Sequence, residues 1–347
     1  MTGAPVAENI FGAHPDEIAG RLAVLGEPPY RARQCSRWIY RRGARSFHAM
    51  SDLAKGLRAT LAESFVIARP EIAAVHPAAD GSRKYDIRLG DGAAIESVLI
   101  MGGKRPALCL SSQVGCALGC TFCRTGEMGL ARNLSAGEIA AQVVAVQEEA
   151  GLPHPAPMSF VFMGMGEPLH NAAEVVRAIG IMTHPDALAI SPRRITVSTA
   201  GYLPGLETLA AAETGVKLAV SLTSPDDDQR STLMPVNRRF PIRDVLARVA
   251  EIKRRRGQRV TIAYVLLSGV NDSRDHARRL ARLVRPMPVK VNLIPFNPYL
   301  GSPYRRPGDA AIEAFRSTLA ESDVLATVRK THGDDVLAAC GQLASAS

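Results

Sequence analysis

The fold of this chain is decided by the fifteen residues Cys109-Leu-Ser-Ser-Gln-Val-Gly-Cys116-Ala-Leu-Gly-Cys120-Thr-Phe-Cys123. They contain four of the six cysteines, and Cys116, Cys120 and Cys123 have the spacing C-x₃-C-x₂-C. Neighbouring turns of a loop bring three such sulfurs together, so the loop can hold one compact metal centre. A 4Fe–4S cluster normally takes four cysteine ligands, and three would leave one iron open to a small molecule. We therefore expect the chemistry of the protein at this loop.

Two kinds of metal site are compatible with three clustered cysteines, a structural zinc site and an iron–sulfur cluster. Zinc usually takes four ligands, commonly as two pairs, and the chain contains no second C-x₂-C pair. The spacing resembles the signature of radical S-adenosylmethionine (radical SAM) enzymes. In that superfamily the open iron binds the amino and carboxylate groups of SAM, and an electron from the cluster releases a 5′-deoxyadenosyl radical. The resemblance implies a 4Fe–4S cluster held by Cys116, Cys120 and Cys123, with SAM as the second cofactor.

Composition narrows the class of protein. With 347 residues, 46% of them hydrophobic, the chain can build a large packed core. No apolar run approaches the roughly 18 residues of a membrane-spanning helix, and Met1–Ile10 lacks the basic and apolar regions of a signal peptide. Six cysteines, mostly clustered, suit a reducing compartment and metal binding better than a disulfide framework. We therefore expect a cytoplasmic protein that does not associate with membranes.

The charge balance points to an anionic partner. The chain carries 42 Lys and Arg against 33 Asp and Glu, a net charge of +9. Such an excess suggests nucleic acid first. Many soluble proteins are basic without binding nucleic acid, so the charge alone leaves both interpretations open.

After Met101 the hydrophobic pattern alternates between strands and helices, which is typical of βα units. The expected strands cover 107–111, 159–163, 194–198, 217–222, 259–266, 289–293 and 324–329. The expected helices cover 135–150, 171–183, 203–213, 241–255, 273–285 and 308–321. About six units form an incomplete (β/α)₆ barrel, too few for a closed eight-stranded one. The predicted fold class is α/β, and residues 102–347 are expected to form the radical SAM core with the C-terminal Cys340 segment.

Polar residues follow several of these strands, at the rim where parallel sheets bind ligands. Gly164-Met-Gly166-Glu167-Pro168 comes after the second strand. Glycines there let the backbone approach a ligand closely, and the carboxylate can accept a hydrogen bond from the SAM amino group. The predicted SAM-binding residues are Gly166, Glu167, Ser198, Ser221, Leu222, Thr223 and Asn292. Taken singly, the polar residues after the later strands are equally well explained as strand-end caps.

Residues 1–68 are expected to form a small helical accessory domain that binds RNA. In the helix expected at 31–42, Arg33, Arg37 and Arg41 recur every four residues and therefore share one face. This row is either an ordinary solvated face or a ridge that contacts phosphates.

A β connector is expected over residues 69–101, between the accessory domain and the core. Its strand candidates are separated by glycine-containing turns and cover 72–75, 83–89 and 94–100. Glu96 lies inside the last of these strands.

Five motifs extend the resemblance beyond the superfamily. They are Ser111-Ser-Gln-Val-Gly-Cys-Ala-Leu-Gly-Cys-Thr-Phe-Cys, Arg132-Asn-Leu, Phe162-Met-Gly-Met-Gly-Glu-Pro, Val291-Asn-Leu-Ile-Pro-Phe-Asn and Ala338-Ala-Cys340-Gly-Gln-Leu. With these five motifs in this order, the chain resembles the RlmN/Cfr family of RNA methyltransferases. Members methylate a ring carbon of adenosine: C2 for the RlmN type, which acts on 23S rRNA and tRNA, and C8 for the Cfr type, which acts on 23S rRNA.

The resemblance implies roles for three further residues. Ring carbons C2 and C8 are poor nucleophiles, so the family uses two SAM molecules. One methylates Cys340, and the radical from the second removes a hydrogen from that methyl group, whose carbon then adds to the ring. Glu96 would remove the ring proton, and Cys109 would attack the sulfur of Cys340, forming a transient disulfide and releasing the RNA. Two buried structural thiols are the rival interpretation of Cys109 and Cys340.

Some positions depart from the family pattern. Thr223 stands where the family usually has His, and a threonine can neither reach as far nor act as an imidazole. Ala263 stands where RlmN-type members carry Glu, which favours the Cfr type. Gly166-Glu-Pro168 and Ile294-Pro-Phe-Asn297 favour the RlmN type. These signs leave C2 and C8 open.

The implied partners are RNA, either 23S rRNA or tRNA, and an electron donor such as flavodoxin, with the protein itself a monomer. Two other functions compete with RNA methylation. One is a radical SAM enzyme acting on a different substrate, against which the intact set of Cys109, Cys340 and Glu96 argues. The other is a non-catalytic iron–sulfur protein that binds RNA.

Overall fold

A ten-stranded open sheet forms the core of the computed structural model, which describes residues 7–102, 105–153, 156–256, 260–287 and 289–344. Within these residues, seven strands pair in parallel in the order of the sequence: β6 (Ala107–Cys109), β9 (Ser159–Phe162), β10 (Ile195–Thr199), β11 (Lys217–Ser221), β12 (Val260–Leu266), β13 (Lys290–Pro295) and β14 (Ala326–Val328). Among the described strands, the two that end the sheet do not pair with each other. The fold is therefore the predicted incomplete barrel, although the first residue of the strand expected at 259–266 lies outside the described residues.

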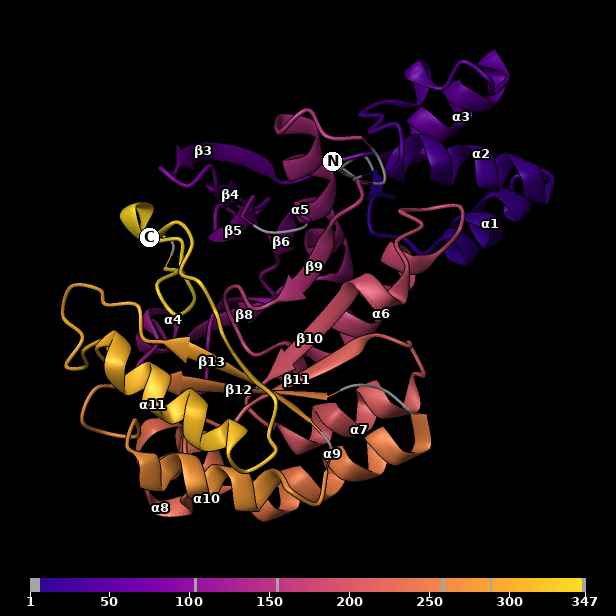
Figure 1. Ribbon diagram of the computed structural model, residues 1–347. Helices are drawn as coiled ribbons and strands as arrows, with labels where there is room; N and C mark the ends of the chain where they lie inside the picture. Colours follow the sequence, from indigo (N-terminus) through magenta and orange to yellow (C-terminus); the bar gives the residue numbers. More distant parts are fainter. Residues whose placement is uncertain (1–6, 103–104, 154–155, 257–259, 288, 345–347) are drawn as a thin grey trace.

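Helices alternate with these strands and cover the outside of the sheet (Figure 1). They are α5 (Ala136–Glu149), α6 (Ala172–Thr183), α7 (Leu203–Ala211), α9 (Ile242–Arg256), α10 (Arg274–Val284) and α11 (Asp309–Ala320). Local sequence explains their start points: Ser135 caps α5 in a capping box with Glu138, and the Ser273 side chain caps α10. The predicted helices are confirmed to within about two residues, the usual uncertainty of helix ends.

Antiparallel strands β3 (Glu71–Pro77), β4 (Arg83–Arg88) and β5 (Ala94–Ile100) continue the same sheet. The strands expected in the connector are thus present, but they extend the core rather than form a separate layer. β5 pairs with β6 so that Val98 lies opposite Cys109. This pairing brings the strand that carries Glu96 beside the strand that carries Cys109.

Several short elements escaped the sequence analysis because each is too brief to show a period. They are the hairpin β7 (Gln113–Gly115) and β8 (Leu130–Asn133), helices α4 (Arg124–Glu127) and α8 (Asp227–Leu233), and the 3₁₀ turns η1 (Phe47–Ala49), η2 (Pro168–Asn171), η3 (Pro192–Arg194), η4 (Pro235–Arg238) and η5 (Asp334–Val336). All but η1 lie in the barrel and its loops.

The N-terminal region, described from residue 7, consists of α1 (Pro15–Val24), α2 (Pro29–Tyr40) and α3 (Lys55–Ser64), closed by the short strands β1 (Glu8–Asn9) and β2 (Phe65–Val66). It packs beside α5 and α6 at one end of the molecule (Figure 1). At Gly12, where φ is +97°, a Cβ would lie 2.5 Å from the Cα of Gly137 at the start of α5. Two glycines therefore allow the backbones of the two regions to touch.

The arginine row of α2 contacts the core of the protein. Arg37 forms an ion pair with Asp186 (2.7 Å), and the Nε of Arg41 donates to the carbonyl of Ala187 (2.8 Å). These two side chains fasten the N-terminal helices to the loop after α6. In this structure Arg37 and Arg41 therefore serve as contacts between the two regions, and the phosphate-ridge interpretation of the row stays a prediction.

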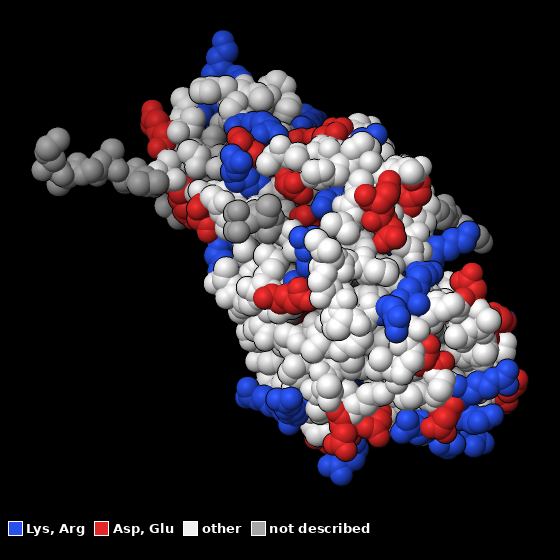
Figure 2. Space-filling view, turned by 90° about the vertical axis from the view of Figure 1, so that its left-hand side faces the viewer, with Lys and Arg blue, Asp and Glu red and all other residues white. Residues whose placement is uncertain are grey.

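At least one face of the molecule carries charges of both signs. On the face shown in Figure 2, Lys and Arg are interspersed with Asp and Glu, and uncharged areas separate them. In the described part of the chain, no helix combines the length and the apolar character that crossing a membrane requires.

Candidate active site

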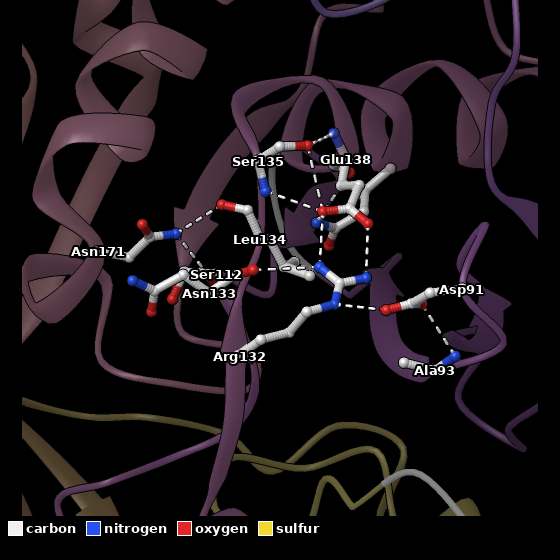
Figure 3. A network of polar contacts seen from close by, with 10 residues as sticks. Asp91, Ala93, Ser112, Arg132, Asn133, Leu134, Ser135, Glu138 and Asn171 are labelled. Atoms are coloured by element: carbon white, nitrogen blue, oxygen red, sulfur yellow. Dashed lines mark hydrogen bonds and ion pairs between the residues drawn. The ribbon is translucent and has the colours of Figure 1, made fainter. Parts of the chain in front are cut away.

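The cysteine loop begins at the hairpin of β7 and β8. The amide of Cys116 donates to the carbonyl of Gly129 (2.7 Å), which closes the loop at its base. Arg132 on β8 donates to both oxygens of Glu138 (2.9 and 2.8 Å) and to Asp91 (2.7 Å), as Figure 3 shows. One side chain of the predicted Arg132-Asn-Leu motif therefore ties the hairpin to α5 and to the turn between β4 and β5. Charge-assisted, bidentate bonds of this kind hold geometry well.

The three clustered cysteines line one cavity of about 170 Å³ at the carboxyl ends of the strands. Predicted residues from five separate segments share its wall: Cys116, Cys120, Cys123, Gly166, Glu167, Ser198, Ser221 and Cys340. The remaining wall is largely apolar, with Leu118, Phe122, Met234 and Phe296 among it. We call this space the cluster cavity.

The thiols of the cluster cavity suit a cationic metal centre. Burial raises the pKa of Cys116 to about 12 and also raises the pKa values of Cys120 and Cys123. The pKa of Cys120 is raised further by the charges of Cys123 and Cys116. Such thiols ionise only when a metal or another cation offsets the charge. The donor set and the dry wall therefore fit an iron–sulfur cluster.

A zinc site and a 4Fe–4S cluster require different arrangements of their cysteine ligands. Over the described ranges, no three His, Cys, Asp or Glu side chains form a group that could hold one metal ion. In a 4Fe–4S cluster, cysteines bind different irons and stand farther apart.

Gly166 and Glu167 shape the wall opposite the cysteines. Gly166 has φ of +93°, and a Cβ there would lie 2.5 Å from the Gln113 side chain, so no larger residue fits. The Glu167 carboxylate accepts from the backbone amides of Leu169 (3.0 Å) and Ala200 (2.8 Å). Burial raises its pKa. Its oxygens thus cap η2 and brace the end of β10, and a ligand would meet this segment mainly through its backbone.

Three predicted SAM residues lie outside the lining of the cluster cavity. Leu222 and Thr223 are fully buried, and the Asn292 side chain accepts from the Thr327 hydroxyl (2.7 Å). Thr223 has φ of +60°, which is strained for a β-branched residue, and its hydroxyl has no hydrogen-bond partner in the described structure. The geometry gives Thr223 no direct contact with this cavity.

A fully buried arginine supports the rim of the cavity. Arg230 on α8 donates to the carbonyls of Ala200 (2.6 Å), Ser221 (3.1 Å) and Leu222 (3.0 Å). Burial lowers its pKa to about 10, and the charge of Cys120 opposes that change. Arg230 therefore holds the ends of β10 and β11 together and adds a positive charge near the cysteine loop. Nothing in the sequence pattern singled it out.

The C-terminal segment, residues 337–344, closes the site from one side. The carbonyls of Gly341 and Leu343 accept from the Arg124 amide (2.8 Å) and the Thr125 hydroxyl (2.5 Å) of α4. The Gln342 side chain donates to the carbonyl of Pro298 (2.7 Å). These bonds position Cys340 beside the cysteine loop, although the two are remote in sequence.

A second, smaller cavity of about 20 Å³ lies behind Cys340. Cys109, Cys340, Met163, Arg329 and Asn297 contribute to its wall. Both cysteines are free thiols in the structure. We call this space the thiol cavity; the structure brings together the two residues to which the sequence assigned a joint role.

Asn297 borders both cavities and was missed by the sequence analysis. Its amide nitrogen donates to the carbonyl of Cys340 (3.1 Å), and its oxygen accepts from the Thr331 hydroxyl (2.9 Å). The signal was present: Asn297 is the second asparagine of the Val291-Asn-Leu-Ile-Pro-Phe-Asn motif, of which only Asn292 was selected. Only the loop after β13 reveals which of the two reaches the site.

Glu96 is buried and fully engaged. One carboxylate oxygen pairs with the Lys84 ammonium (3.0 Å), and the other accepts from the Ala344 amide (2.9 Å). It lies against the C-terminal segment but lines neither cavity. The predicted base thus contacts the C-terminal segment that contains Cys340, and both of its carboxylate oxygens already have partners.

Comparisons with known proteins agree with this geometry. The model of the radical SAM superfamily matches residues 110–281, and that of the ribosomal RNA large subunit methyltransferase N-terminal domain matches residues 8–67. The chain is 47% identical over 338 residues to a dual-specificity RNA methyltransferase RlmN of an Anaeromyxobacter species, covering 95% of this chain and 89% of that protein. It is 46% identical over 335 residues to the RlmN of Geobacter sulfurreducens, covering 96% and 91%.

One solved structure is similar over nearly the whole chain. The crystal structure of a radical SAM methyltransferase from Sphaerobacter thermophilus has a TM-score of 0.91 and 44% sequence identity. The match covers 97% of this chain and 99% of that one. The open barrel, the N-terminal helices and the C-terminal segment are therefore shared as one architecture.

Proposed function

Because this chain belongs to the RlmN family of radical SAM RNA methyltransferases, we propose that it methylates C2 of an adenosine in 23S rRNA or tRNA. The choice of C2 rests on the RlmN relatives, which outweigh the Cfr-like Ala263. The reaction would use two SAM molecules per turnover and a one-electron donor such as flavodoxin.

One observation carries the proposal. Cys340 lines both the cluster cavity and the thiol cavity, and Cys109 lines the second. A thiol at the boundary can receive a methyl group on one side and meet a second thiol on the other. A merely structural thiol at Cys340 would have no reason to border both the three cluster cysteines and Cys109.

The residues of the cluster cavity fit the two cofactors. Cys116, Cys120 and Cys123 would hold the 4Fe–4S cluster, and the backbone at Gly166 together with Ser198, Ser221 and Asn297 would contact SAM. When bound, the cluster and SAM supply an electron, a methyl group and a carbon-centred radical. Arg230 keeps the strand ends that carry this wall in place.

Cys340 would act as the methyl carrier and Cys109 as the resolving thiol. Once the carrier carbon is joined to adenine, the Cys109 thiolate attacks the sulfur of Cys340. A sulfur–sulfur bond forms as the sulfur–carbon bond breaks, and its electron pair passes to the adenine unit, whose exocyclic carbon takes up a proton to become methyl. External thiols then reduce the disulfide for the next turnover.

Glu96 would be the base that removes the ring proton. In the structure its carboxylate accepts from Lys84 and from the Ala344 amide. To reach a proton on adenine, the carboxylate has to release the Ala344 amide. The proposal therefore includes a shift of the end of the C-terminal segment when RNA binds.

The test is anaerobic reconstitution with iron, sulfide, SAM, dithionite and 23S rRNA or tRNA, followed by mass spectrometry of the adenosine nucleosides. We expect 2-methyladenosine from the parent and none from Cys340→Ala, which should retain the visible absorption of the cluster. Cys109→Ala should accumulate a covalent enzyme–RNA adduct on a denaturing gel.

Cys35 provides the matched control. It is a free cysteine buried in α2, remote from both cavities, and burial raises its pKa to about 12. Cys35→Ala should lose a little stability and keep full methylation. Normal product from Cys340→Ala, or 8-methyladenosine from the parent, would contradict the proposal.

A further inference from the structure

A cation without a counter-ion faces the thiol cavity. Arg329 follows β14, and its amide donates to the carbonyl of Leu293 (2.8 Å), which extends the pairing of β14 with β13. Its side chain lines the thiol cavity together with Cys109 and Cys340. In the described part of the chain, no carboxylate lies within ion-pair distance of its guanidinium. The hydrogen bond that its Nη1 donates goes to the Met163 sulfur (3.3 Å).

The acidic groups around this cavity are already paired with other cations. Glu96 on β5 pairs with Lys84, and Asp80 pairs with His332 (2.7 Å), whose ring also lines the cavity. Lys330 lines the cavity too, but its side chain is exposed. Arg329 is therefore the partly buried positive charge that remains available to the two thiols.

The size of the cavity makes this charge matter. A space of about 20 Å³ holds about one water molecule, so little water is available to hydrate an anion there. Burial raises the pKa of Cys109 to about 12, and the charge of Cys340 raises it further, whereas Arg329 and the Met163 amide lower it. The cation and the amide thus replace solvent around the sulfur.

We propose that Arg329 is a positioning residue that stabilises the thiolate of Cys109 for its attack on the sulfur of Cys340. This inference rests on the function proposed above and deepens its last step. The Cys109 proton leaves to water, the thiolate forms the sulfur–sulfur bond, and the sulfur–carbon bond to the RNA breaks. Arg329 keeps its own proton throughout and takes no part in the bond changes.

The test follows the lifetime of the enzyme–RNA adduct in a single turnover between pH 7 and 9. In Arg329→Met we expect the adduct to accumulate and to decay at least tenfold more slowly than in the parent at pH 7, since each pKa unit costs about tenfold in thiolate. Its decay should accelerate with rising pH, by about tenfold per pH unit. Arg329→Lys, which keeps the charge, should restore most of the rate.

Arg316→Met is the matched control, because it removes a half-exposed arginine of α11 that forms an ion pair with Glu313. The adduct of this variant should decay at the parent rate at every pH. Cys109→Ala gives the reference for a blocked step. Suppose that Cys109→Ala accumulates the adduct. This inference alone is then overturned if the adduct of Arg329→Met decays at the parent rate. It is also overturned if that adduct decays slowly at every pH and Arg329→Lys does not restore the rate. If Cys109→Ala accumulates no adduct, the proposed function itself fails.

Discussion

The cluster cavity and the thiol cavity share Cys340 but differ in size and in charge. The first holds about 170 Å³ between apolar side chains and three cysteines, and the second holds about 20 Å³ beside Arg329. The first has room for ligands that come and go, whereas the second admits about one water molecule. In the proposed function, this difference separates a chamber for the cofactors from a space in which two thiols meet beside Arg329.

The same C-terminal segment closes both spaces. Its bonds to α4 and to the loop after β13 keep Cys340 between them. Small movements of this segment would therefore change access to both cavities at once, and would also free or engage Glu96 through Ala344.

The largest effect is expected when a cysteine of the cluster cavity is removed and the result is compared with removal of a cysteine of the thiol cavity. Cys120→Ala removes one of three cluster ligands, so we expect loss of the visible iron–sulfur absorption and of all methylation. Cys109→Ala, which changes the thiol cavity alone, should keep the absorption and lose only turnover. Equal cluster loss in both variants, measured by iron content and absorption spectra, would show that the cavities are not independent.

An intermediate effect is expected at the boundary. Asn297→Ala leaves the Cys340 carbonyl and the Thr331 hydroxyl without their partner, which costs about 1–3 kcal/mol. Part of this cost would appear as a fall in turnover on the order of tenfold, because 1.4 kcal/mol corresponds to that factor.

Asn292→Ala is the informative comparison, since it makes the same change in the same motif outside both cavities. The steady-state methylation rates of Asn297→Ala and Asn292→Ala show which of the two asparagines acts at the site. An equal or larger fall in Asn292→Ala would restore the sequence-based choice of Asn292 and contradict the assignment to Asn297.

The smallest effect is expected at Thr223, which borders neither cavity. Thr223→Val keeps the shape but removes a buried hydroxyl that has no partner, so we expect a gain of about 1 kcal/mol in the free energy of unfolding. Thr199→Val should instead destabilise, because the Thr199 hydroxyl accepts from the Gly201 amide (3.0 Å). Denaturant unfolding of the two variants measures both changes. If Thr223→Val lowers the free energy of unfolding as Thr199→Val does, the Thr223 hydroxyl has a partner after all.

The succession of strands and helices was predictable because each core strand and helix is long enough to show its period of burial. The elements of three or four residues, such as β7, β8 and α4, carry no such signal and were missed. The seventh parallel strand, β14, is three residues long and completes the sheet only by pairing with β13.

The sequence by itself determined the family: the spacing of Cys116, Cys120 and Cys123, and the motifs that contain Cys109 and Cys340, depend on residue identity and order. The tertiary structure alone decided which asparagine reaches the site, that Thr223 is buried, that Arg37 and Arg41 bind the core, and that Arg329 faces two thiols. These facts depend on contacts between segments far apart in the chain. Local periodicity contains no record of such contacts, because burial and charge pairing arise only when the segments pack together.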